Sequence, residues 1–188
     1  MKLKHLILGI QLLAMCTLSM SAQETSDLYS IKNGAVVVEK IIAFDVSKEI
    51  ASAAVKSYFL TTLNDSNETL KNSSDDYYVA KIMTPKLHQY SMGWFTVGYL
   101  TIDVKFKEDR MKVSVSCNDI LNSNSNGSNA THYNPIDAAP INPKHDSWKY
   151  NIMKKPAEET FKNLVLYMAS IVVELNSSVQ NAKAEEDW

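Results

Sequence analysis

The segment Phe95–Cys117, with the sequence FTVGYLTIDVKFKEDRMKVSVSC, decides the fold. Apolar and polar side chains alternate up to Lys107, and the alternation resumes at Met111 after Glu108-Asp109. Successive side chains on a strand point to opposite faces, so this pattern predicts two antiparallel strands joined by a turn, with one face on a core and the other in water. The side chains predicted to face the core are Leu100, Ile102, Val104, Phe106, Met111, Val113, Val115 and Cys117.

Two further segments are predicted to extend this sheet. Ala35 to Phe44 is rich in β-branched residues, which favour a strand over a helix. Asp76 to Thr84 alternates and stops at Pro85, with Tyr78, Ala80 and Ile82 on one face. The polar stretch between them, Asn64 to Ser74, is expected to be a loop because Asn, Asp and Ser compete for backbone hydrogen bonds.

Two amphipathic helices are predicted. The first runs from about Lys48 to Leu63, with Ser47 as its N-terminal cap. The second begins near Pro156 and ends near Asn181, and its apolar residues recur at steps of three and four. Each helix has one apolar face to bury, so both should cover one face of the antiparallel sheet. The predicted class is therefore α+β, in the order β-α-β-β-β-α, with a long irregular loop before the last helix.

The chain is expected to divide into four parts. Residues 1–22 have the charged start, apolar middle and small-residue end of a secretory signal peptide, and the apolar run is too short for a permanent membrane anchor. Lipid attachment at Cys16 is the alternative, although Met15 stands where lipoprotein signals carry a small residue. A flexible lead-in at 23–34 precedes a single α+β domain at 35–182, and a polar tail at 183–188 follows. Residues 118–155, rich in Asn, Ser and Pro, are expected to form a long loop insert within the domain.

Charge and cysteine content narrow the functional classes. Loss of residues 1–22 removes two lysines and no acid, so the net charge changes from −2 to −4. A mildly acidic, exported protein is a poor candidate for nucleic-acid binding, which needs a basic face. Cys117 would then be the only cysteine, and its place on the apolar face predicts a buried, inert thiol. We expect a periplasmic or secreted protein without a permanent transmembrane segment.

The residues that carry a family resemblance are the Phe44-Asp45-Val46-Ser47-Lys48 exit into the first helix and the charged hairpin Val104–Val113. They resemble an exported domain of unknown function with a TATA-binding-protein-like fold, found in Bacteroidetes-type bacteria. The match covers about Ala35 to Ile120. It departs at the long insert and at Met111, where an aromatic residue is expected. The resemblance implies a fold and an exported location, and it brings no activity and no functional residue.

No catalytic signature is present. The five glycines are placed so that no phosphate-binding loop or nucleotide turn can form, and no helix carries a histidine pair for zinc. Four residues of the insert could converge on a metal, but their spacing matches no known pattern, so we predict no metal site and no cofactor. These residues are His132, Asp137, His145 and Asp146.

Aromatic residues are the remaining candidates for a site. Tyr77, Trp94 and Tyr99 lie on or beside the predicted sheet, and Trp148 lies near the end of the long loop. These side chains either line a ligand site or pack in the core beneath the loop or a helix. The first alternative predicts a non-enzymatic binding module of the cell envelope, with a protein, peptide or glycan as partner. Two other hypotheses stay open: a hydrolase or other enzyme with an unrecognised site, and an assembly protein that acts through a sheet edge.

Overall fold

The computed structural model describes residues 28–62, 70–74, 76–89, 93–124, 130–138 and 154–186. The predicted signal peptide, Cys16, Trp148, His145 and Asp146 lie outside these residues. The described strands are β1 Ser30–Lys32, β2 Ala35–Ala43, β3 Leu70–Ser74, β4 Tyr77–Met83, β5 His88–Gln89, β6 Trp94–Lys107, β7 Arg110–Asn124 and β8 Thr131–Tyr133. The helices are α3 Lys48–Thr62, the 3-10 helix η2 Pro135–Ala138, and α6 Lys154–Glu186.

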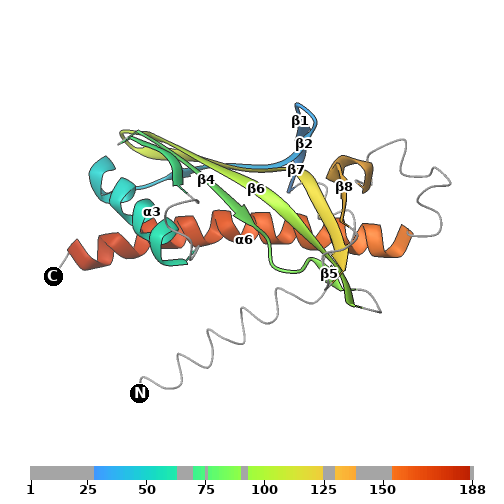
Figure 1. Ribbon diagram of the computed structural model, residues 1–188. Coiled ribbons are helices and arrows are strands. Elements are labelled where there is room, and N and C mark those ends of the chain that lie inside the picture. The colour runs from blue at the N-terminus through green and yellow to red at the C-terminus, as the bar shows by residue number, and fades with distance from the viewer. Residues whose placement is uncertain are drawn as a thin grey trace, which may run out of the picture.

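The strands form one antiparallel sheet, and two helices lie on one side of it (Figure 1). The strand order is β1-β2-β7-β6-β4-β3, and β5 and β8 add to β6 and β7. The predicted α+β class is therefore confirmed. The β6–β7 hairpin lies at the centre of the sheet and turns at residues 108–109, as the sequence predicts. All eight side chains predicted to face the core are buried.

The first hairpin corrects the expectation of a flexible lead-in. Ser30–Lys32 pairs with Ala35–Val37 as strand β1. The two residues between the strands, Asn33 and Gly34, have φ angles of 51° and 78°. Asn and Gly adopt this left-handed conformation most readily, and a two-residue loop of this kind matches the twist of a β-hairpin.

Helix α3 starts at its predicted cap. The Ser47 hydroxyl oxygen accepts a hydrogen bond from the Ile50 backbone N–H at 3.3 Å. The Ser52 and Tyr78 hydroxyls lie 2.9 Å apart in a hydrogen bond that joins the helix to β4. Tyr58 donates to the Glu174 carboxylate at 2.8 Å and so joins α3 to α6. Burial raises the pKa of the Tyr58 hydroxyl, and the bond to Glu174 adds to the effect.

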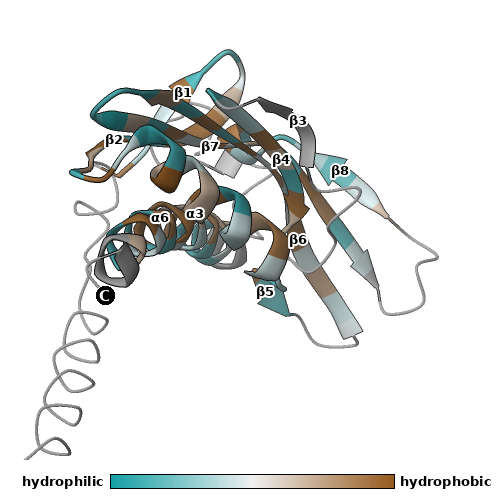
Figure 2. Cartoon of the chain, turned by 90° about the vertical axis from the view of Figure 1, so that its left-hand side faces the viewer, coloured by the Kyte–Doolittle hydropathy of each residue, from teal (hydrophilic) through white to brown (hydrophobic). Residues whose placement is uncertain are grey.

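Helix α6 runs along the underside of the sheet (Figure 1), and its apolar stripe faces the strands (Figure 2). Gly98 on β6 permits a close approach, because a Cβ there would lie 3.2 Å from Leu164 Cδ1. Among the described residues, no helix combines the length and apolar character needed to cross a bilayer. The buried residues of the stripe are Phe161, Leu164, Val165, Met168, Ile171, Val172, Leu175 and Val179, as predicted.

Three other expectations need correction. Residues 70–74, expected in a loop, form the edge strand β3, which needs only backbone pairing with β4. The insert expected to start at residue 118 starts later, because β7 continues to Asn124 and 131–133 pairs with it as β8. Helix α6 continues to Glu186, beyond its predicted end near Asn181, so residues 183–186 of the predicted polar tail are helical.

Candidate functional site

The sheet face opposite the helices is open toward the 108–109 turn. Within the described part of the chain, no helix packs on this face (Figures 1 and 2). Ile41 is 66% exposed on β2, and Met83 is 58% exposed on β4. We call this side of the sheet the open face.

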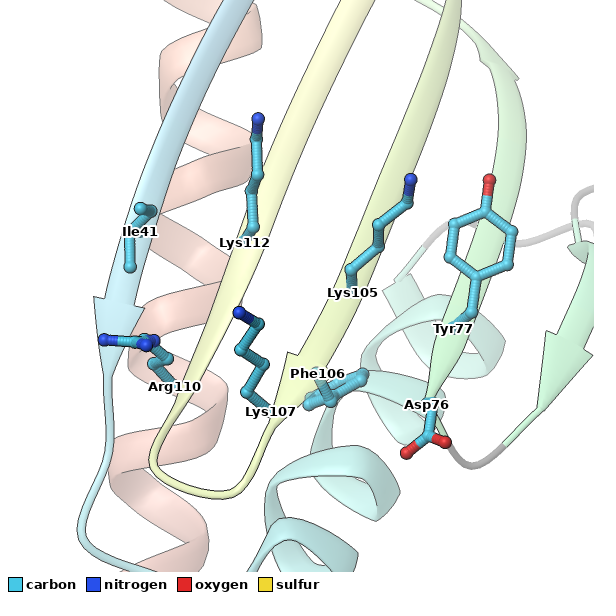
Figure 3. A pocket seen from close by; sticks show the side chains of 8 residues that line it. All are labelled: Ile41, Asp76, Tyr77, Lys105, Phe106, Lys107, Arg110 and Lys112. Atoms are coloured by element: carbon cyan, nitrogen blue, oxygen red, sulfur yellow. The ribbon is translucent and has the colours of Figure 1, made fainter.

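The register of the central hairpin places four cations together on the open face (Figure 3). Lys105 is the cross-strand partner of Lys112, and Lys107 is the partner of Arg110. Cross-strand partners project from the same face, so these residues form two adjacent rows of two positive charges. We call the four residues the cationic rows.

The row nearer the centre of the sheet continues onto both neighbouring strands. Ile41 on β2 pairs with Lys112, and Tyr77 on β4 pairs with Lys105. An apolar side chain therefore stands at one end of the row and an aromatic ring at the other (Figure 3). The Lys105 ammonium lies over the Tyr77 ring, 5.3 Å from its centroid, which is within the range of a cation–π contact.

The cationic rows line a shallow depression of about 870 Å³. Its other lining residues are Ile41, Tyr77, Phe106 and Asp76, so it combines apolar side chains with four cations and one carboxylate. A smaller depression of about 220 Å³ lies beside it and is lined by Asp103, Lys105, Lys112 and Ser114. The open face is therefore hollowed along the rows and not flat.

The carboxylates around the depression are already engaged. Glu39 contacts both Lys32 and Lys112, with Lys112 Nζ at 3.0 Å from its carboxylate. Asp76 pairs with Lys48 at 2.6 Å, outside the rows. Asp103 accepts a hydrogen bond from the Tyr77 hydroxyl at 2.5 Å. Among the residues that the structure describes, these contacts leave much of the positive charge of the rows without a carboxylate partner.

Two pKa values report these contacts. The hydrogen bond to Asp103 raises the pKa of Tyr77 to about 12, because a neutral phenol is needed to donate to the carboxylate. The hydrogen bonds from Lys32 and Lys112 hold the pKa of Glu39 below its usual range. Tyr77 therefore stays neutral and Glu39 stays charged near neutral pH.

The geometry can be compared with known proteins. No family model matches the sequence, and no curated protein matches it. Two solved structures are similar. The first is a TBP-like protein from Parabacteroides distasonis, with a TM-score of 0.58 and 14% sequence identity over 81% of this chain and 97% of that chain. The second is a DUF4468 family protein from Bacteroides ovatus, with a TM-score of 0.61 and 11% sequence identity over 86% of this chain and 96% of that chain. The chain has the TBP-like fold. At such low identity the likeness establishes the fold alone, and it confirms the resemblance that the sequence suggested.

The structure does not gather the predicted aromatic site residues in one place on the TBP-like sheet. Tyr77 borders the depression, whereas Tyr99 pairs with Met83 at the other end of β4, about 20 Å along the strand. Trp94 starts β6, and strand alternation places it on the same side as Gly98, toward the helices. Trp148 lies outside the described residues. Tyr77 is thus the one member of the set that lines the hollow in the described chain.

A second cluster on the open face bears on the enzyme hypothesis. The His132 Nδ1 lies 2.9 Å from the Asp119 carboxylate, and its ring stacks on Tyr99 at 13°. The side chains of His132 and Asp119 are 57% and 37% exposed, and neither lines the depression. General acid–base catalysis also needs a substrate site within reach of such a pair. This cluster does not make a catalytic site by itself.

The described residues offer no other reactive constellation. They contain no group of three or more His, Cys, Asp or Glu side chains that could hold a metal ion. Cys117 is buried as predicted, and burial raises its pKa to about 11, which disfavours the reactive thiolate. The open face thus offers positive charge, hydrogen-bonding groups and apolar side chains.

The cationic rows were not recognised as a site from the sequence, although a signal was present. Lys105, Lys107 and Lys112 appear there only as the solvent side of the alternating strands. A tight turn at residues 108–109 fixes the register on both sides of it. Counting outward from the turn pairs Lys107 with Arg110 and Lys105 with Lys112, so the rows could have been derived from the residues alone.

Proposed function

We propose that this chain is a non-catalytic binding module of the cell envelope, and that its ligand rests on the open face of the TBP-like sheet. The observation that carries the proposal is the depression on that face, lined by the two cationic rows, Ile41 and Tyr77. Ligand sites are concave and combine apolar side chains with polar or charged groups, and this depression has both kinds of lining. The proposed location outside the cytoplasm rests on the signal-peptide pattern of residues 1–22.

The surroundings of the rows argue against nucleic acid as the ligand. A nucleic-acid duplex is bound through many phosphate contacts spread along a basic surface. Here Glu39, Asp76 and Asp103 border the rows, and the whole chain carries a net charge of −2. A long polyphosphate chain would meet these carboxylates on leaving the depression.

A glycan and peptide array tests the proposal with a pair of matched variants. Ser114 lies on the open face and lines the smaller depression, so Ser114→Trp places a bulky ring over the rows. Ser177 is exposed on α6, and Ser177→Trp makes the same chemical change away from the sheet. Circular dichroism would establish that both variants keep the fold.

The proposal predicts array ligands that bind the wild-type chain and the Ser177→Trp variant and that lose binding to Ser114→Trp. Ligands that bind all three chains equally would place the binding surface elsewhere. Turnover of an array compound, abolished by a change at His132 or Asp119, would favour the enzyme hypothesis instead.

A further inference from the structure

The cationic rows are an unfavourable arrangement for the free protein. Like charges directly opposite each other on neighbouring strands destabilise a sheet, and the hairpin contains two such pairs in succession, Lys105 with Lys112 and Lys107 with Arg110. A bound anion removes this repulsion. The cost in the free protein and its relief on binding together point to negative charge in the ligand.

The four cations differ in how far they are already neutralised. Lys112 contacts Glu39, and Arg110 lies 3.7 Å from Asp109 in a solvent-exposed pair. Exposed pairs of this kind contribute little. Lys105 contacts the Tyr77 ring, and within the described chain neither Lys105 nor Lys107 has a carboxylate within ion-pair distance. Lys105 and Lys107 are therefore the charges most available to a ligand.

The spacing of the rows sets the size of the anion. Neighbouring strands lie about 4.8 Å apart, and two residues along a strand span about 6.8 Å. An anion with two or three negative groups is therefore large enough to reach both rows, and the flexible lysine side chains can converge on groups that lie closer together. Lysine presents a compact charge on a flexible stem, so the site accepts carboxylate, sulfate or phosphate groups without demanding a planar one.

We infer that the ligand is a compact anion that carries two or three carboxylate, sulfate or phosphate groups, held by Lys105, Lys107, Arg110 and Lys112. This inference rests on the proposed function and names the ligand class of the same site. Ile41 and Tyr77 border the row, so they contact the uncharged part of the ligand. Asp103 limits the length of the anionic part, because its hydrogen-bond donor Tyr77 is neutral and a further negative group beyond the rows would meet its charged carboxylate.

Isothermal titration calorimetry of the full chain tests the inference with three compact probes and one long one. The compact probes are citrate, inorganic pyrophosphate and a disulfated disaccharide, which separate the carboxylate, phosphate and sulfate sources. A single-stranded DNA oligonucleotide serves as the long polyanion. The titrations compare the wild-type chain with the double variant Lys105→Gln/Lys107→Gln. The control is Lys81→Gln, an exposed lysine on the open face that does not line the depression.

We expect at least one compact probe to bind with a Kd below about 1 mM in low salt. The double variant should weaken this binding at least tenfold, about 1.4 kcal/mol, whereas the Lys81→Gln control stays close to the wild type. Raising the salt from about 0.05 to about 0.5 M should also weaken binding, because exposed charges are screened. Both lysines are solvent-exposed, so the double variant should keep the fold.

Three results would overturn the inference. The first is that no compact probe binds with a Kd below about 1 mM. The second is that the double variant binds as tightly as the wild type. The third is that only the oligonucleotide binds and loses affinity in the double variant, which would make the ligand a long polyanion. Neutral array ligands blocked by Ser114→Trp would leave the proposed function intact while refuting its anionic ligand.

Discussion

The hydrogen bond between Tyr77 and Asp103 offers a sharp test of how the open face is organised. Tyr77→Phe removes the hydroxyl that donates to the Asp103 carboxylate at 2.5 Å and keeps the ring beneath Lys105. A hydrogen bond to a charged group contributes about 1.5–3 kcal/mol. Tyr77 and Asp103 are only partly buried, so solvent screening reduces this to about 1 kcal/mol of unfolding free energy near pH 8.

The same bond predicts a pH dependence whose sign can be worked out. The folded-state pKa of Tyr77 is about 12, above the ordinary value of 10.0 that applies to the unfolded chain. A raised pKa means that the neutral form is favoured in the fold, so the stabilisation is complete below pH 10 and is lost as the pH rises through 12. The wild type should therefore lose its advantage over Tyr77→Phe across this range.

Urea unfolding followed by far-ultraviolet circular dichroism, repeated at intervals from pH 8 upward, measures this difference. Groups whose surroundings the substitution leaves unchanged contribute equally in both chains and cancel in the comparison. Tyr99→Phe is the matched control, because Tyr99 lies on the same face and its hydroxyl makes no hydrogen bond that the described structure shows. A difference between wild type and Tyr77→Phe that is absent at pH 8, or that stays constant up to high pH, would refute the reasoning.

The variant also has an expected effect on binding. In the wild type the Tyr77 hydroxyl engages Asp103, which lies on the same face as Lys105 and lines the smaller depression with it. Without that hydroxyl the carboxylate is free to pair with Lys105. Tyr77→Phe should therefore weaken the binding of a compact anion although it removes no positive charge.

Two further predictions concern the core. Leu164→Ala opens a cavity between α6 and Gly98 and should lower the free energy of unfolding, measured in urea, by about 2–5 kcal/mol. Val173 is 61% exposed on the same helix, so Val173→Ala should change this free energy by less than about 0.5 kcal/mol. Equal effects of the two substitutions would contradict the placement of α6. Cys117 should resist a maleimide reagent until denaturant is added, because it is buried and its pKa is about 11. The control variant Ser114→Cys should add a site that reacts at once. Rapid labelling of Cys117 in the native wild type, located by peptide mapping, would contradict the burial.

The parts of the fold that the sequence predicted are those where burial follows a strict period. Leu100, Ile102 and Val104 alternate with polar residues, and every second side chain is indeed buried. The stripe on α6 repeats at helical steps, and its side chains are buried. In both cases one apolar face determines both the secondary structure and its orientation.

The strands that the sequence does not predict have a weak or interrupted alternation of apolar and polar residues. Asn118 has no partner on β6, because Leu100 pairs with Cys117 and Tyr99 with Asp119. This bulge shifts the alternation by one residue, so the next core-facing side chain after Cys117 is Ile120 and not residue 119. The alternating pattern is broken there, and the sequence does not show that one strand continues through it. Strand β3 is an edge strand held by backbone hydrogen bonds, which leave no apolar pattern in its sequence.

The candidate site was missed for a different reason. Aromatic side chains were sought as binding residues, and of these Tyr77 borders the depression whereas Tyr99 and Trp94 lie elsewhere. The positive charges were assigned to solvated strand faces. A strand pattern shows which side a residue faces, and only the register across strands shows that four cations meet.

The central claim is that the ligand rests on the cationic rows of the open face. An NMR titration that follows backbone amide shifts of the full chain with the tightest compact anion tests it most directly. We expect shifts that concentrate at Lys105, Lys107, Arg110 and Lys112 and that leave α3 and α6 unchanged. Shifts concentrated on the helices, or spread evenly over the chain, would contradict it.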